Sequence, residues 1–130
     1  MKCWRQIHSL CVALDYRQSI GGEEAIYNYC HALAMEGGAL VAKMLGTQVM
    51  ENEASTLTAM MVNVEIPLVT QQANAQALFI QKLLNEQNSM VVPYKHNGKW
   101  WVRLSAQIYN SLEDFEKAAR AIQKVCSELC

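Results

Sequence analysis

The spacing of apolar residues in the first half of the chain predicts a long amphipathic helix. Between Glu23 and Gly46 the apolar and glycine positions recur every three or four residues, as on one helix face: Ile26, Cys30, Leu33, Gly37, Leu40, Val41 and Met44. Glu23 and Glu24 suit the positive end of the helix dipole, and Gly46 suits a C-terminal stop. Gly37 and Gly38 interrupt the pattern at about 1 kcal/mol each relative to alanine. We expect either a bend there or the close approach of another backbone.

Alternation of apolar and polar residues predicts three strands further along. The first covers residues 58–68 (TAMMVNVEIPL) and buries one face, made of Met60, Val62, Val64 and Ile66. The second and third cover residues 89–94 (SMVVPY) and 99–105 (KWWVRLS). Asn97-Gly98 lies between them and predicts a two-residue type I′ turn, so these two strands should form a hairpin.

Two further helices complete the predicted fold. The first covers residues 71–87, with an inward face of Ala73, Ala77, Ile80, Leu83 and Leu84. The second covers 111–129, with Ser111 and Asp114 forming a capping box and an apolar stripe of Phe115, Ala119, Ile122, Cys126 and Leu129. This order predicts an α+β fold: a small three- to four-stranded, mainly antiparallel sheet, covered on one side by helices and preceded by a long helix. Before it, residues around SLCVALDYRQS are also helical in pattern and end at Gly21-Gly22.

Composition excludes several classes of protein. The chain has 130 residues, typical of one domain, and is 52% hydrophobic and 18% charged, which excludes disorder. Its apolar runs fall far short of the ~20 residues that a membrane span needs, and the first residues do not resemble a signal peptide. We therefore expect a cytoplasmic protein without a membrane partner.

Charge argues against a nucleic-acid partner, because 11 basic and 12 acidic residues give a net charge of −1. Lys95, Lys99 and Arg103 beside Trp100 and Trp101 could stack a base, but so few cations are more typical of a solvated hairpin edge.

The cysteines and histidines do not predict a metal site. An odd number of cysteines (Cys3, Cys11, Cys30, Cys126 and Cys130) indicates reduced thiols. Cys126 and Cys130 share a helix face and could supply half of a metal site, but no second pair with ligand spacing accompanies them. We interpret them as small apolar residues near a chain end.

Arg103 is the candidate binding residue. It shares a strand face with Trp101 and Ser105, whereas Trp100, Val102 and Leu104 form the face suited to packing under helices. No acidic residue occurs in the ten residues before Arg103, and the first acidic residue after it is Glu113. A guanidinium binds a carboxylate through two parallel hydrogen bonds. The partner is either internal, by stacking on Trp101 or pairing with Glu65, or the carboxylate of a ligand.

Two stretches of sequence resemble a known family. RLSAQIYNSLEDFEKAARAI resembles the C-terminal end of class V aminotransferases, the fold-type I pyridoxal-phosphate enzymes that include cysteine desulfurases and isopenicillin N epimerase-like proteins. The matching residues are Arg103, Ser105, Tyr109, Asn110 and Asp114. ALDYRQSIGGEEAIYNYCHALAMEGGALVAKMLGTQVM resembles the helix that joins the large domain to the small one, most closely in the fungal branch with hercynylcysteine sulfoxide lyase-like proteins.

This resemblance implies a division of the chain and a role for Arg103. Residues 1–22 would be a remnant of the large domain or its linker, and residues 23–130 the small C-terminal domain. Arg103 would bind the α-carboxylate of an amino-acid-like substrate. In the family, the large domain supplies the Schiff-base lysine and the other groups that hold pyridoxal phosphate. None of the seven lysines here, at 2, 43, 82, 95, 99, 117 and 124, lies in such a context, so we expect no catalytic or cofactor-binding residue in this chain.

Three functional hypotheses follow from the resemblance. In the first, the chain is the C-terminal substrate-binding part of a pyridoxal-phosphate-dependent lyase or aminotransferase-like enzyme and is inactive alone. In the second, it is a non-catalytic module that associates with a full-length paralogue or with a second copy of itself. In the third, it is a remnant without function. Because a small domain packs on its large domain, we expect an uncovered apolar patch on this chain.

Overall fold

The computed structural model describes residues 4–70 and 72–130, with side chains from residue 9 onward. Over these residues the fold is α+β, as predicted. The elements in chain order are α1 (Trp4–Ser19), α2 (Gly22–Leu45), β1 (Met61–Ile66), α3 (Ala75–Gln87), β2 (Pro93–His96), β3 (Lys99–Ser105) and α4 (Leu112–Leu129).

The three strands form one antiparallel sheet with β3 in the centre, in the order β1-β3-β2. The β2–β3 hairpin turns at Asn97 (φ 49°) and Gly98 (φ 75°). Two consecutive positive φ values are what a type I′ turn requires, which confirms this prediction. The outer edge of β1 is partly paired as well, because Met50 N–H donates to the Asn63 carbonyl (2.8 Å) and Glu65 N–H donates to the Gln48 carbonyl (2.9 Å).

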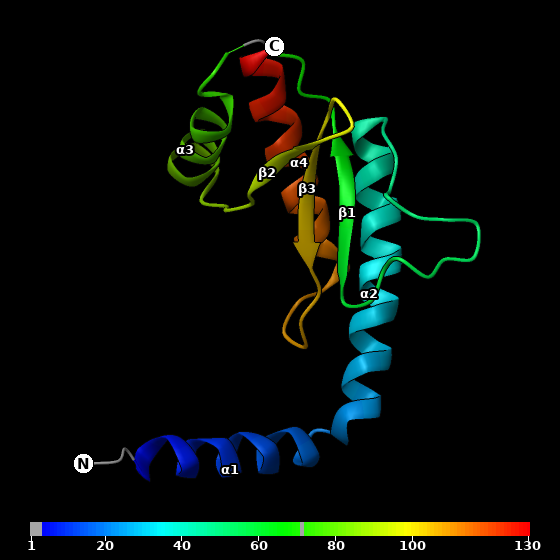
Figure 1. Ribbon diagram of the computed structural model, residues 1–130, viewed down its shortest axis with the longest axis vertical. Helices are drawn as coiled ribbons and strands as arrows, with labels where there is room; N and C mark the ends of the chain where they lie inside the picture. The colour runs from blue at the N-terminus through cyan, green and yellow to red at the C-terminus, as the bar shows by residue number, and fades with distance from the viewer. Residues whose placement is uncertain (1–3, 71) are drawn as a thin grey trace.

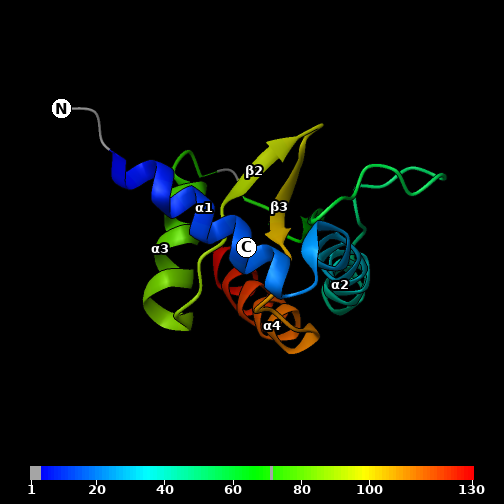
Figure 2. The same cartoon turned by 90° about the horizontal axis from the view of Figure 1, so that it is seen from below.

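Helices cover one face of this sheet and leave the other open. The long helix α2 packs on β1 and against α4, while α3 packs against α4 and β2 (Figures 1 and 2). The core lies between helices and sheet, and its most deeply buried large side chains are Phe79, Leu83, Ile122, Val41, Val62, Val64, Val102 and Val125. The predicted face of β1 is confirmed for Val62, Val64 and Ile66, whereas Met60 precedes the strand and is exposed.

The glycine pair in α2 is explained by packing. The helix runs through Gly37 and Gly38, and both are buried. A Cβ at Gly37 would lie 2.4 Å from Cδ1 of Phe115, and a Cβ at Gly38 would lie 2.5 Å from Cγ2 of Val62. The expected close approach is therefore made by side chains of α4 and β1, not by another backbone.

The predicted inward face of α3 is confirmed for Leu83 but is wrong for most of its other residues. The buried residues are Ala75, Phe79 and Leu83, whereas three of the predicted ones are exposed: Ala73, Ala77 and Leu84. Phe79 was missing from the predicted face, yet it is fully buried. A phenylalanine gains much more from burial than an alanine does, so it decides which face turns inward. The second strand is also shorter than predicted, because it begins only at Pro93.

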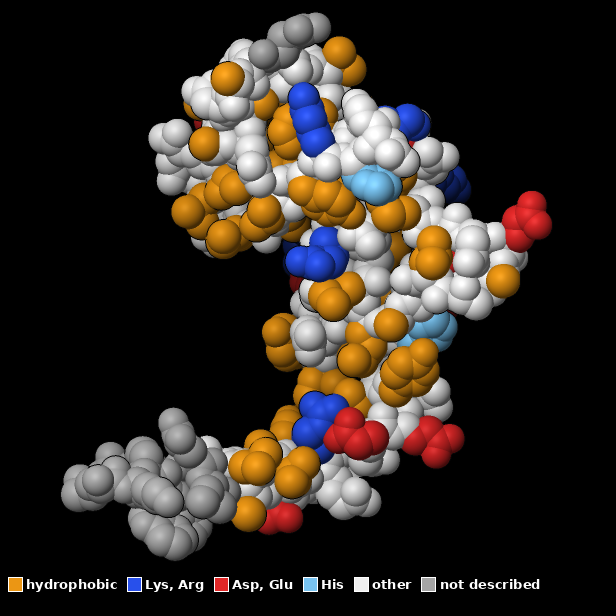
Figure 3. All heavy atoms as spheres, in the orientation of Figure 1, with side chains coloured by type: hydrophobic (Ala, Val, Ile, Leu, Met, Phe, Trp, Pro, Cys, Tyr) orange, Lys and Arg blue, Asp and Glu red, His pale blue; other side chains and the backbone are white. Residues whose placement is uncertain are grey.

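Helix α1 extends away from the rest of the molecule. It turns at Gly21 and Gly22, whose φ values of 115° and 78° favour glycine, and among the described elements it contacts α2 alone. Its exposed apolar side chains are Leu10, Val12, Leu14 and Tyr16, and Ile20 just after the helix is exposed as well. Figure 3 shows hydrophobic side chains on the concave side of the C-shaped molecule. Among the described residues, no helix has the length and hydropathy to cross a bilayer.

Candidate carboxylate-binding site

Arg103 lies on the open face of the central strand. The predicted faces of β3 are confirmed, because Val102 and Leu104 are buried in the core while Arg103 and Ser105 are exposed. Trp101 is buried on the open face, with 6% of its surface exposed, and its indole N–H donates to the carbonyl of His96 (3.2 Å). This face therefore presents a guanidinium beside a buried, fixed aromatic ring.

Among the described residues, neither Glu65 nor Trp101, the internal partners considered for Arg103, is found paired with it. The carboxylate of Glu65 pairs with Lys99 (2.8 Å), so the pairing of Glu65 with Arg103 is wrong. The cation stacked on a hairpin tryptophan is Lys95, 5.0 Å from the ring centre of Trp100. Among the side chains that the structure describes, no acid lies within ion-pair distance of Arg103. The guanidinium is thus available to an external anion.

We expect Arg103→Leu to change the free energy of unfolding by less than about 0.5 kcal/mol, or to raise it slightly, because an exposed side chain without a partner adds little stability. Denaturant unfolding of both proteins measures this change. A loss of several kcal/mol would instead indicate a buried ion pair that the substitution leaves half broken.

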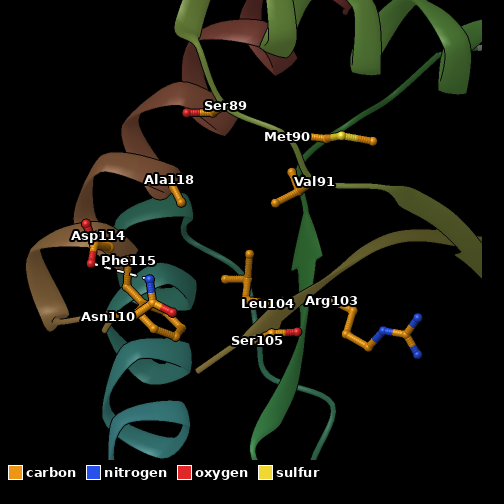
Figure 4. Close-up of a pocket in the computed structure, with 10 residues that line it drawn as sticks. All are labelled: Ser89, Met90, Val91, Arg103, Leu104, Ser105, Asn110, Asp114, Phe115 and Ala118. Atoms are coloured by element: carbon orange, nitrogen blue, oxygen red, sulfur yellow. Dashed lines mark hydrogen bonds between the residues drawn. The ribbon is translucent and has the colours of Figure 1, made fainter. Parts of the chain in front are cut away.

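Two hollows meet at Arg103. One, of about 320 Å³, extends toward α4 and is lined by Ser105, Asp114, Phe115 and others. The second, of about 690 Å³, is lined by Asn63, Met90, Val91, Val92, Tyr94 and Arg103. Figure 4 shows the Arg103 side chain extended away from Asn110 and Asp114. We therefore assign the candidate site to the second hollow, over the open face of the sheet.

A polar pair crosses the sheet beside Arg103. The hydroxyl of Tyr94 on β2 donates to Oδ1 of Asn63 on β1 (2.8 Å), so the bond passes over β3. Burial raises the pKa of Tyr94, and the positive charge of Arg103 opposes that rise. The hydroxyl therefore stays protonated at neutral pH and acts as a donor. The sequence reasoning missed this pair; the alternation on β1 placed Asn63 on the polar face, but the register with β2 was not predictable.

Two other residues of the family-like motif, Asn110 and Asp114, serve structure. The side-chain oxygen of Asn110 accepts from Gln107 N–H (3.1 Å), and the backbone carbonyl of Asn110 accepts from the hydroxyl of Tyr29 (2.6 Å). The carboxylate of Asp114 accepts from Ser111 N–H (2.9 Å) in the predicted capping box, and that backbone bond lowers the pKa of Asp114. The bonds from Gln107 N–H and Ser111 N–H fix the turn between β3 and α4, and so fix the end of the strand that carries Arg103.

None of the described lysines is fully buried. A Schiff-base lysine must lose its proton, which a desolvated pocket or a nearby cation promotes. Lys82 is half-buried between Glu86 (3.2 Å) and Glu128 (2.7 Å), and these carboxylates raise its pKa. The other described lysines are exposed at positions 43, 95, 99, 117 and 124; Lys2 lies outside the described residues.

The cysteines at the C-terminus have separate environments. Cys126 is buried in the core, and burial raises the pKa of its thiol to about 12. The thiol of Cys130 is exposed and donates to the carbonyl of Pro67 (3.4 Å). Over the described residues, no group of three or more histidine, cysteine or acidic side chains could hold a metal ion.

Comparison with curated proteins finds three relatives. Hercynylcysteine sulfoxide lyase of Schizosaccharomyces pombe is 35% identical over 116 residues, which cover 88% of this chain and 28% of that protein. The L-cysteine desulfhydrase-like proteins lolT2 and lolT1 of Epichloe uncinata are 31% and 30% identical over 149 residues. Each alignment covers 92% of this chain, and 32% and 33% of the relative. The chain thus spans a third or less of the length of these relatives. No family model matches it.

Comparison with solved structures confirms the fold. The crystal structure of Oryza sativa TDC with PLP and tryptamine superposes with a TM-score of 0.55 at 15% sequence identity. The match covers 78% of this chain and 22% of that one.

Proposed function

Because this chain is a small domain of the fold-type I pyridoxal-phosphate enzyme type, we propose that it is the substrate-binding part of a class V aminotransferase-like lyase, with Arg103 binding the α-carboxylate of an amino-acid-derived substrate. The relatives are a sulfoxide lyase and proteins resembling a cysteine desulfhydrase, so the preferred substrate class is a sulfur-containing amino acid. Fixing its carboxylate would orient the bond to be cleaved against the cofactor.

The single observation that carries this proposal is the open guanidinium of Arg103. An unpaired, always-charged donor fork on a mostly apolar strand contributes nothing evident to folding, whereas it matches a carboxylate in shape and charge. Its strand is fixed by the sheet and by the capped turn to α4. A rigid position of this kind is what a substrate anchor needs.

The cofactor would come from a large domain, in the same polypeptide or in another one. We propose that residues 23–130 are the small domain and that residues 1–22, which include the whole of α1, belong with the large domain. The exposed apolar side chains of α1 support this assignment, because such a helix gains stability when a partner covers it. They equally suit the alternative function, a non-catalytic module that binds a full-length paralogue.

Titration of this chain with S-methyl-L-cysteine tests the proposal. The probe has the carboxylate of a sulfur amino acid and no free thiol to react with the cysteines. We expect saturable shifts of the Arg103 side-chain N–H signal in nitrogen-15 NMR spectra, with an affinity of about 1 mM or weaker, because one exposed ion pair provides little free energy. The control ligand 2-(methylthio)ethylamine lacks the carboxylate and should shift nothing.

Two variants of Arg103 should differ from the wild type in their affinity for S-methyl-L-cysteine. Arg103→Lys keeps the charge but loses the two parallel donors, so it should bind the probe several-fold more weakly; Arg103→Leu should not bind it. If S-methyl-L-cysteine and its amine analogue shift Arg103 equally, or if Arg103→Leu binds the probe as the wild type does, the proposed role of Arg103 is wrong.

A further inference from the structure

Asn63 faces Arg103 directly across the sheet. The two residues are Cα partners in the β1–β3 register, so their side chains leave the same face with Cβ atoms about 4.5–5.5 Å apart. Both line the hollow of about 690 Å³. A ligand group bound by the guanidinium at this point is therefore within reach of the Asn63 amide.

The Tyr94 hydroxyl sets the orientation of that amide. Because the hydroxyl donates to Oδ1 of Asn63, Oδ1 is occupied and the amide nitrogen is the group left for a ligand. Among the described residues, no hydrogen-bond acceptor is recorded for Nδ2 of Asn63. Tyr94 itself is held on β2 opposite the buried Trp101, and burial keeps its hydroxyl protonated at neutral pH. The pair thus presents an N–H donor next to a cation.

We propose that Asn63 is a second anchor for the substrate carboxylate, its Nδ2 donating to a carboxylate oxygen, and that Tyr94 is the positioning residue that aims it. This inference rests on the proposed role of Arg103 and extends it. The chemistry favours a carboxylate over a larger anion, because one cation and one neutral amide match a single negative charge with two acceptor oxygens. The apolar side chains of Met90, Val91 and Val92 would then face the rest of the ligand.

The experiment is the titration with S-methyl-L-cysteine, observed at two reporters in the same spectra. The first reporter is the Arg103 side-chain N–H, and the second is the side-chain NH₂ pair of Asn63. We expect both to shift with one common affinity. Neither should respond to 2-(methylthio)ethylamine at the same ionic strength.

Two substitutions separate a binding role from a structural one. Tyr94→Phe removes the hydroxyl alone and should weaken probe binding three- to tenfold while leaving the unfolding midpoint nearly unchanged. Asn63→Asp places a carboxylate opposite Arg103 and should weaken binding at least tenfold, because it pairs with the guanidinium and repels the ligand. Tyr29→Phe, which also removes a hydrogen-bonded hydroxyl but lies away from this hollow, is the matched control and should change affinity less than twofold.

The outcomes distinguish a failure of the role of Asn63 and Tyr94 from a failure of the role of Arg103. If Arg103 shifts but the Asn63 amide does not, or if Tyr94→Phe binds the probe like Tyr29→Phe, this inference is overturned while the role of Arg103 stands. If neither reporter shifts, the role of Arg103 fails and this inference fails with it. A common affinity at both reporters, lowered by Tyr94→Phe and Asn63→Asp, supports it.

Discussion

Replacing Gly37 by alanine is expected to lower the free energy of unfolding by about 1 kcal/mol. Helix propensity alone predicts the opposite, because alanine is favoured over glycine inside a helix by about 1 kcal/mol. The new Cβ would lie 2.4–2.7 Å from three atoms of the Phe115 ring, and this ring is buried in the core. Overpacking of this kind costs about 1–3 kcal/mol. Denaturant unfolding measures the change in the free energy of unfolding, and its sign shows whether helix propensity or overpacking against Phe115 is the larger effect.

A double-mutant cycle provides the control for Gly37. Phe115→Leu removes ring atoms that the new methyl group would meet, so Gly37→Ala should cost much less in that background than in the wild type, by about 1 kcal/mol or more. Gly38 and Val62 offer a second, independent pair of the same kind. If Gly37→Ala stabilises the protein, or if the cycle shows no coupling, α2 does not pack on α4 as described here.

Local sequence signals predicted much of the fold because local physics determines those parts. Asn97-Gly98 adopts the left-handed backbone that few other dipeptides accept. Ser111 and Asp114 cap α4 through bonds between near neighbours. Alternation from Val102 to Ser105 matches the buried and exposed faces of β3, and Trp101 is the exception because it is buried on the open face. In each case the contacts that determine the structure join residues close together in the sequence, so a local sequence pattern is enough to predict them.

Features that depend on distant contacts were not predictable in the same way. The inward face of α3 is set by what Phe79 packs against, and the glycine pair of α2 is explained only by Phe115 and Val62. In the site, Arg103 was identifiable from its isolation and from the family-like motif. The bond between Tyr94 and Asn63 was not, because it requires the register of both outer strands on β3.

The largest chemical effect that we expect concerns the cofactor. The isolated chain should not hold pyridoxal phosphate, because none of its described lysines combines an enclosed position with an environment that removes the proton from the amine. Lys82 comes nearest to burial, yet its two carboxylate neighbours raise its pKa. A lysine held in its charged form cannot attack the aldehyde of the cofactor. Supplying a large domain should be necessary for any turnover.

The central claim is our proposal that this chain carries the anchor for the substrate carboxylate but, among its described residues, no lysine for the cofactor. Its most direct test is to mix the isolated chain with one equivalent of pyridoxal phosphate, reduce with borohydride, remove the free cofactor by gel filtration and map pyridoxyl-lysine by mass spectrometry. The account predicts only trace labelling, spread over the exposed lysines and equal to that of the urea-unfolded chain. Near-stoichiometric labelling of a single lysine, lost on unfolding, would contradict it.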